Sequence, residues 1–133
     1  MRSISRIAIA GLVAWGILAG ALPASAATSR ASSSVVTRSG SCTGTSTWTL
    51  KVKPDAPGRI ETDLEVETKI AGQRWRSRFR DNGVLFGHGV RTTKADGSFS
   101  ITRFATDGSG TDAIRVRSVN LSTAEVCTAT AAL

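Results

Sequence analysis

Four arginines alternate with other residues between Arg74 and Arg80, and two aromatic residues, Trp75 and Phe79, lie among them. Basic side chains with interleaved aromatic rings are typical of proteins that bind single-stranded nucleic acid, because the cations contact phosphates and the rings stack on bases. The spacing argues against that function here. Successive side chains of a β-strand point to opposite faces, so the arginines would share one face while Trp75, Ser77 and Phe79 point into the core.

A row of acidic side chains precedes this basic segment. Between Ile60 and Ile70 the even positions hold Ile, Thr, Leu and Val, and positions 61, 63, 65 and 67 hold acids. If the two segments pair as a hairpin around Ala71-Gly72, the loop must have two or four residues, because a slip of one residue would turn an arginine toward the core. The shorter loop predicts a charge ladder of three pairs: Glu67 with Arg76, Glu65 with Arg78, and Asp63 with Arg80.

The longer loop would still pair Glu67 with Arg78. Either register predicts a salt-bridged, solvated sheet face, so we do not expect nucleic acid as a partner. The same pairing makes the acids poor catalysts, because a carboxylate beside an arginine has a lowered pKa. Hydrolysis of a glycosidic bond needs a carboxyl of raised pKa facing a second one across a cleft.

The remaining chemistry-bearing residues also predict no active site. His88 is the only histidine and lies between two glycines, with no nucleophile elbow nearby. We interpret it as part of a Gly-rich bend or bulge in an edge strand. Among the acidic segments, the oxygen-rich turn Asp107–Asp112 is the best candidate for binding calcium, although it lacks the spacing of an EF-hand loop. We therefore predict a protein that is not an enzyme, without catalytic residues, a cofactor or a metal site.

The N-terminal segment has the three parts of a secretory signal peptide. Arg2 and Arg6 precede an apolar run from Ile7 to Leu22, and small residues follow up to Ala26. The run of 16 residues is shorter than the roughly 20 that a membrane-spanning helix needs. We predict cleavage of residues 1–26, a secreted protein, and no membrane span in the mature chain; a retained membrane anchor is the alternative.

Charge and cysteine content fit a small extracellular domain. The chain has 133 residues with 17 Lys and Arg against 10 Asp and Glu; without Arg2 and Arg6 the basic count falls to 15, which leaves a net charge of +5. If the unpaired cations gather on one face, they favour acidic polymers such as wall phosphates, nucleic acid or sulfated glycans. The two cysteines, Cys42 and Cys127, predict a disulfide in this oxidising compartment; a free reactive thiol is the alternative.

Turn residues divide the chain after Cys42 into short alternating segments, which is typical of an all-β sandwich. We predict a flexible Ser/Thr-rich leader over residues 27–41 and one immunoglobulin-like antiparallel β-sandwich of about seven strands over residues 42–133. The expected strands are Thr45–Lys53, Ile60–Ile70, Gln73–Asp81, Val84–Thr93, Ser98–Thr106, Asp112–Asn120 and Glu125–Ala131. Asn82-Gly83 predicts a two-residue hairpin turn.

The same alternation predicts a core made by one side chain in two along each strand. The Asn82-Gly83 hairpin would place Phe79 opposite Phe86 on the inner face. The candidate core residues are Leu64, Val66, Trp75, Phe79, Val84, Phe86, Ile114 and Val116.

Two stretches resemble the later strands of bacterial immunoglobulin-like domains: Asp96-Gly97-Ser98-Phe99-Ser100-Ile101, and the run from Gly110 to Asn120. The layout of signal, short leader and a domain bracketed by two cysteines is similar to small secreted actinobacterial proteins of unknown function. The resemblance implies a sandwich over roughly residues 42–131. It implies no particular function, and antibody-type domains differ in carrying an inter-sheet disulfide between their second and sixth strands.

Three functions fit these expectations. The first is a secreted, non-enzymatic module that binds a cell-wall polymer, a glycan or another secreted protein. The second is a small inhibitor or small-molecule carrier, for which the segment Lys53–Gly58 is the candidate inhibitory loop. The third is a cationic protein that binds polyanions.

Overall fold

The structure is a computed structural model that describes residues 20–21 and 34–133. Apart from Gly20 and Ala21, the predicted signal peptide lies outside the described residues, as does the predicted leader up to residue 33. Among the residues that are described, no helix is long and apolar enough to cross a membrane.

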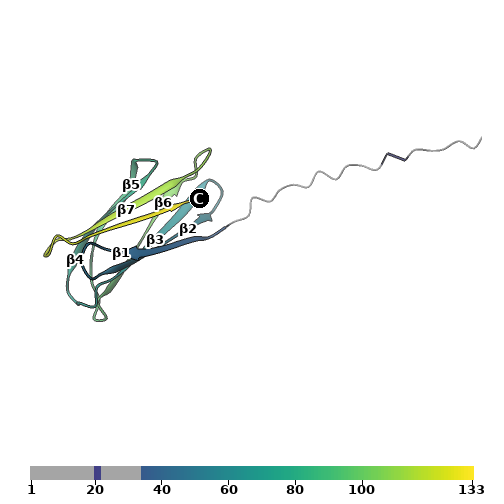
Figure 1. Cartoon of the computed structure of the whole chain (residues 1–133). Helices are drawn as coiled ribbons and strands as arrows, with labels where there is room; N and C mark the ends of the chain where they lie inside the picture. Colours follow the sequence, from purple (N-terminus) through teal and green to yellow (C-terminus); the bar gives the residue numbers. More distant parts are fainter. Residues whose placement is uncertain (1–19, 22–33) are drawn as a thin grey trace, which may run out of the picture. The chain divides into compact units, whose positions relative to one another are not determined.

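The domain is an all-β sandwich of antiparallel strands, which confirms the predicted fold class (Figure 1). One sheet has the order β1-β2-β3-β6 and the other the order β5-β4-β7-β8. Strands β2 to β8 are the seven expected ones, and β6 returns to the first sheet after the β4–β5 hairpin, as in a Greek key. The eight strands are β1 (Val36–Ser41), β2 (Thr47–Asp55), β3 (Arg59–Glu67), β4 (Arg74–Asp81), β5 (Val84–Thr92), β6 (Ser98–Thr106), β7 (Ala113–Asn120) and β8 (Val126–Ala132).

Strand β1 corrects the C-terminal part of the flexible leader predicted over residues 27–41, because Val36–Ser41 form a strand. It pairs with β2 along its whole length, from Val36 opposite Val52 to Ser41 opposite Thr47. Gly40 lets this Ser/Thr-rich segment pack closely against Trp48 of β2. A Cβ atom on Gly40 would lie 2.6 Å from the ring of Trp48, so only glycine lets the strand lie against that ring. Strand β1 thus covers Trp48, which would otherwise expose its apolar ring at the sheet edge.

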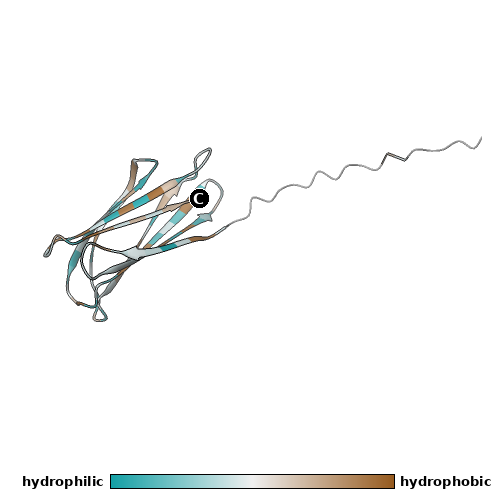
Figure 2. Ribbon diagram, in the orientation of Figure 1, coloured by the Kyte–Doolittle hydropathy of each residue, from teal (hydrophilic) through white to brown (hydrophobic). Residues whose placement is uncertain are grey.

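Apolar side chains fill the space between the two sheets, and Figure 2 shows the alternation of hydrophobic and hydrophilic residues along the strands. The candidate core residues that are buried are Leu64, Val66, Trp75, Phe79, Ile114 and Val116. Phe86 is half-buried, with its ring 5.9 Å from that of Phe79.

The prediction for Val84 is wrong. Its exposed fraction is 69%, because it lies opposite Asp81 at the tip of the β4–β5 hairpin, on an edge strand. The turn itself is the two-residue Asn82-Gly83 turn that the sequence predicts, with left-handed φ angles of 46° and 85°. Next to the turn, the register of the β4–β5 pair shifts at a bulge between Phe79 and Arg80. Gly87 rather than Phe86 therefore lies opposite Phe79.

The predicted charge ladder is also wrong, because β3 and β4 belong to different sheets. Strand β3 pairs with β2 and β6, and strand β4 pairs with β5 and β7. Asp63 therefore lies opposite Lys51 and Thr102, while Arg80 lies opposite Leu85 and Arg115. None of the expected pairs of Asp63, Glu65 and Glu67 with Arg76, Arg78 and Arg80 forms.

The connection between β3 and β4 crosses from one sheet to the other instead of turning back as a hairpin. Lys69 and Gly72 adopt left-handed φ angles of 63° and 78°. Two threonine hydroxyls hold the crossing in place: Thr68 donates to the Gly97 carbonyl at 2.8 Å, and Thr93 donates to the Ile70 carbonyl at 2.6 Å. A hairpin and this crossing bury the same alternate residues, so alternation alone could not distinguish them.

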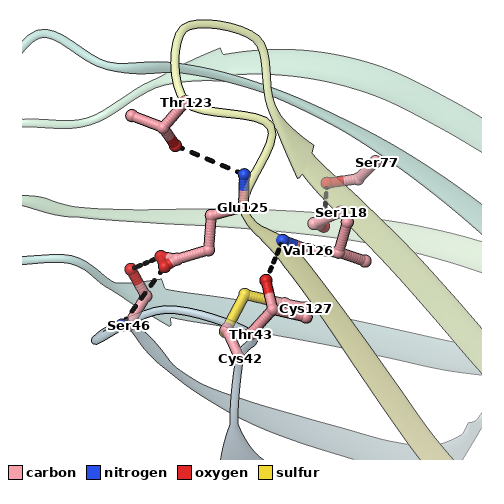
Figure 3. Close-up of a disulfide and its surroundings, with 9 residues drawn as sticks. All are labelled: Cys42, Thr43, Ser46, Ser77, Ser118, Thr123, Glu125, Val126 and Cys127. Atoms are coloured by element: carbon pink, nitrogen blue, oxygen red, sulfur yellow. Dashed lines mark hydrogen bonds between the residues drawn. A yellow bond between two sulfur atoms is a disulfide. The ribbon is translucent and has the colours of Figure 1, made fainter.

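The predicted disulfide between Cys42 and Cys127 is confirmed (Figure 3). It joins the residue that follows β1 to strand β8 in the other sheet. Glu125 beside it accepts a hydrogen bond from the Ser46 hydroxyl at 2.5 Å, and the Val126 amide donates to the Thr43 hydroxyl at 2.9 Å. With 85 residues of sequence separation, the chain-entropy model assigns the crosslink about 4–5 kcal/mol of stabilisation.

Candidate functional site: an arginine face on one sheet

Six arginines lie on the outer face of the second sheet. Four come from β4, at alternate positions, and two come from its neighbour β7. Register places Arg78 directly opposite Arg117 and Arg80 opposite Arg115, so the two rows lie side by side. We call this surface the arginine face; its members are Arg74, Arg76, Arg78, Arg80, Arg115 and Arg117.

Shallow furrows run beside the β4 arginines. Arg76, Arg78 and Arg80 line a hollow of about 520 Å³ on the β5 side and another of about 450 Å³ on the β7 side. Small apolar side chains border these hollows, with Leu85 and Val90 on β5 and Val119 and Leu121 toward β7. The surface therefore offers guanidinium groups beside apolar side chains, arranged along the strand direction.

No counter-charge accompanies the arginine face. Within residues 34–133 the ion pairs are Lys53 with Glu61, at 3.4 Å, and Arg59 with Asp55, and both lie elsewhere. The residues opposite the arginines are neutral or cationic: His88 and Val90 on β5, and Thr128 and Thr130 on β8 beside β7. Six like charges held together without acids are an arrangement that an anionic ligand would relieve.

The acids lie on the outer face of the first sheet. Glu61, Asp63, Glu65 and Glu67 share β3, beside Lys51 and Lys53 of β2. Lys53 pairs with Glu61, and Asp63 accepts a hydrogen bond from the Thr102 hydroxyl at 3.0 Å. The two sheets thus present outer surfaces of opposite chemistry, and the sandwich core separates them.

The aromatic residues do not join the arginine face. Trp75 and Phe79 point into the core and are fully buried, as the alternation predicts. Phe104 is exposed, but it lies on β6 of the other sheet, where the Arg59 guanidinium stacks 4.4 Å from its ring centre. In the described part of the chain, the face therefore has no Trp, Tyr or Phe ring on which bases could stack, and His88 is the ring that lies beside it.

His88 lies on edge strand β5, opposite Arg78. The two glycines that flank it make room for Arg103 of β6. A Cβ atom on Gly87 or Gly89 would lie 2.8 Å or 2.6 Å from the Arg103 side chain. The Arg103 guanidinium donates to the His88 carbonyl at 2.8 Å, which closes the seam between the two sheets. The Gly-His-Gly sequence is thus explained by packing, and the β5 bulge lies next to it.

The acidic turn Asp107–Asp112 contains one buried carboxyl. Asp112 is only 3% exposed, and burial together with the nearby Asp81 carboxyl raises its pKa. A hydrogen bond to Asp112 raises the pKa of Asp107. Within residues 20–21 and 34–133 no group of three or more His, Cys, Asp or Glu side chains is arranged to hold a metal ion.

The segment Lys53–Gly58 is a tight hairpin connection rather than an extended loop. Asp55 still pairs with Arg59 across it, and the Arg59 guanidinium donates to the Asp55 carboxylate at 2.7 Å. Only Ala56, Pro57 and Gly58 remain outside the strands, with Gly58 at a φ of 75°. This geometry leaves little chain for insertion into a protease cleft.

Sequence reasoning identified the β4 arginines but not their partners. Arg115 and Arg117 of β7 are also two residues apart and point outward. An Arg-x-Arg sequence in each of two strands was therefore the signal that could have predicted a shared arginine surface. Comparisons with protein-family models, with curated proteins and with solved structures each found no match.

Proposed function

We propose that this protein is a secreted, non-enzymatic β-sandwich module that binds a linear polyanion through the arginine face. The main support for this proposal is that six arginines lie together on β4 and β7 and that, in the described chain, no acid pairs with them. Like charges at adjacent sheet positions destabilise the fold. Their accumulation on one surface is therefore better explained by a ligand than by folding.

Arginine favours phosphate, because its planar guanidinium donates two parallel hydrogen bonds to one oxyanion. Alternate residues of a strand are about 6.6 Å apart and neighbouring strands about 4.8 Å apart, so the two rows suit a chain of repeated anions that runs along β4. A phosphate-bearing cell-wall polymer fits this chemistry first. Sulfated glycans share it in part, and nucleic acid would be held mainly through its backbone, since the described face has no Trp, Tyr or Phe ring for stacking.

An extracellular location supports the same proposal. The disulfide between Cys42 and Cys127 suits an oxidising compartment, and the N-terminal segment has the pattern of a secretory signal. A phosphate polymer of a cell wall lies in that compartment.

Retention on immobilised ligands tests the proposal. The mature protein is applied at 0.15 M salt to a glycerol-phosphate wall polymer, to heparin and to single-stranded DNA. The double variant Arg78→Gln/Arg117→Gln removes two charges from the face, and the control Lys51→Gln/Lys94→Gln removes two charges elsewhere. We expect the face variant to lose retention on the wall polymer while the control keeps it. Equal losses would show that net charge alone drives binding, and no retention of the unaltered protein would refute polyanion binding.

A further inference from the structure

A separate pocket of about 670 Å³ lies where the β4–β5 turn and the start of β7 meet β8 and β1. It opens at the opposite end of the sandwich from the disulfide. Ten residues line it: Arg38, Arg80, Asn82, Gly83, Ala113, Ile114, Arg115, Thr130, Ala131 and Ala132. We propose that this pocket binds a small amphipathic anion, namely a single phosphate or carboxylate attached to a compact apolar group. The proposal goes beyond polymer binding.

Small side chains create the hollow. Ala113 and Ala132 lie opposite each other on β7 and β8 and are exposed, so a longer side chain at either would occupy space that is now open. Ile114 and Ala131 border the pocket from the core side and are themselves buried. A Cβ atom on Gly83 would meet no heavy atom within 4 Å, so the turn leaves the entrance unobstructed. A volume of several hundred Å³ with a partly apolar lining is typical of small-molecule sites.

Hydrogen bonds hold the rim of the pocket in place before any ligand arrives. The Asn82 side chain donates to the Thr111 carbonyl at 3.1 Å and accepts from the Ala113 amide at 3.2 Å. These bonds fix the β4–β5 turn against the start of β7. A preformed site loses less conformational entropy on binding than one that must be ordered by its ligand.

Three guanidinium groups give the pocket its chemistry. Arg80 and Arg115 come from opposite positions on β4 and β7, and Arg38 comes from β1 of the other sheet. No acidic side chain belongs to the lining. Arginines from three strands can surround one oxyanion, while the exposed methyl groups of Ala113 and Ala132 contact an apolar body. Arg38 distinguishes this pocket from the arginine face, since it is the one lining arginine from the other sheet.

Calorimetric titration of the mature protein with phenyl phosphate tests the site, with inorganic phosphate and phenol as the separate halves of the ligand. We expect phenyl phosphate to bind at least about tenfold tighter than either, since the pocket contacts both parts. The variants Arg38→Gln and Ala132→Leu should each weaken phenyl phosphate by about tenfold, through loss of a charged hydrogen bond and loss of space respectively. Arg76→Gln, on the arginine face but outside the pocket, should leave this affinity within about twofold.

Three results would overturn the proposal. They are equal affinity for inorganic phosphate and phenyl phosphate, an unchanged affinity in Ala132→Leu, or an equal loss in Arg76→Gln and Arg38→Gln. The polymer assay separates this site from the arginine face, because Arg38→Gln should leave retention on the wall polymer intact. Failure of the pocket and failure of the face are therefore distinguishable.

Discussion

Replacing Arg78 with glutamine should stabilise the domain. Arg78 lies in the middle of the arginine face, opposite Arg117 and two positions from both Arg76 and Arg80. A salt-bridged ladder would predict the reverse, because the substitution would then remove a favourable pair. The sign of the effect therefore distinguishes the sheet arrangement of the structure from the hairpin that alternation suggested.

The magnitude follows from three repulsions. Unit charges about 6 Å apart in water repel by about 0.7 kcal/mol, and those about 7 Å apart by about 0.6 kcal/mol. The cross-strand neighbour and the two neighbours along β4 together cost about 2 kcal/mol without salt. At 0.15 M salt the Debye length of about 8 Å reduces this cost to about 1 kcal/mol, and at 1 M salt, with a length of about 3 Å, it falls close to zero.

Urea unfolding measures the change, since urea adds no ionic strength. We expect the free energy of unfolding of Arg78→Gln to exceed that of the unaltered protein by about 1–2 kcal/mol at low salt, with the difference shrinking steadily as salt rises. Lys51→Gln is the matched control, because Lys51 lies opposite Asp63 and its loss should be neutral or destabilising. A less stable Arg78→Gln, or a difference that ignores salt, would refute the reasoning.

Three further predictions concern the core, the crosslink and the buried carboxyl. Trp75→Ala should lower the free energy of unfolding by about 3–5 kcal/mol, because Trp75 is fully buried; a loss under about 1 kcal/mol in urea unfolding would contradict that burial. Cys42→Ser should cost about 4–5 kcal/mol, and added reductant should then leave the variant's unfolding curve unchanged while it shifts that of the unaltered protein. Because folding raises the pKa of Asp112, its protonated carboxyl contributes to stability. This contribution is complete below the pKa of the unfolded chain, and it is lost as the pH rises through the pKa of the folded protein. Asp112→Asn keeps an acceptor for the Gly108 amide and abolishes that loss, so it should be more stable at pH 7 but not at pH 3; equal effects at both pH values would show that the carboxyl's ionisation is irrelevant.

The alternation of apolar and polar residues was sufficient to predict which face of each strand points into the core. It placed Trp75, Phe79 and Val116 inside and the arginines outside, and the structure agrees. It could not choose the neighbours of a strand, because an inner face is satisfied equally by a hairpin partner or by the facing sheet. At the crossing, the hydroxyls of Thr68 and Thr93 bond to carbonyls 29 and 23 residues away in sequence, and contacts of this range leave no local pattern.

The missed strand β1 has a different cause. Its composition is that of a leader, and its order comes from contact with Trp48 and from pairing with β2. Neither contact has a local signature, although Gly40 is where the ring requires a residue without a side chain. The arginine face was missed for a related reason, since its two rows come from strands whose pairing the sequence left undetermined.

The salt dependence of polymer affinity tests the central claim most directly. For a single-stranded polyanion the slope of log K against log salt is about −0.7 per phosphate contacted, so contact with four to six arginines predicts a slope of roughly −3 to −4. Arg78→Gln/Arg117→Gln should make this slope shallower by about 1.4, and Lys51→Gln/Lys94→Gln should leave it unchanged. A slope near zero, or one that the face variant does not alter, would contradict binding through the arginine face.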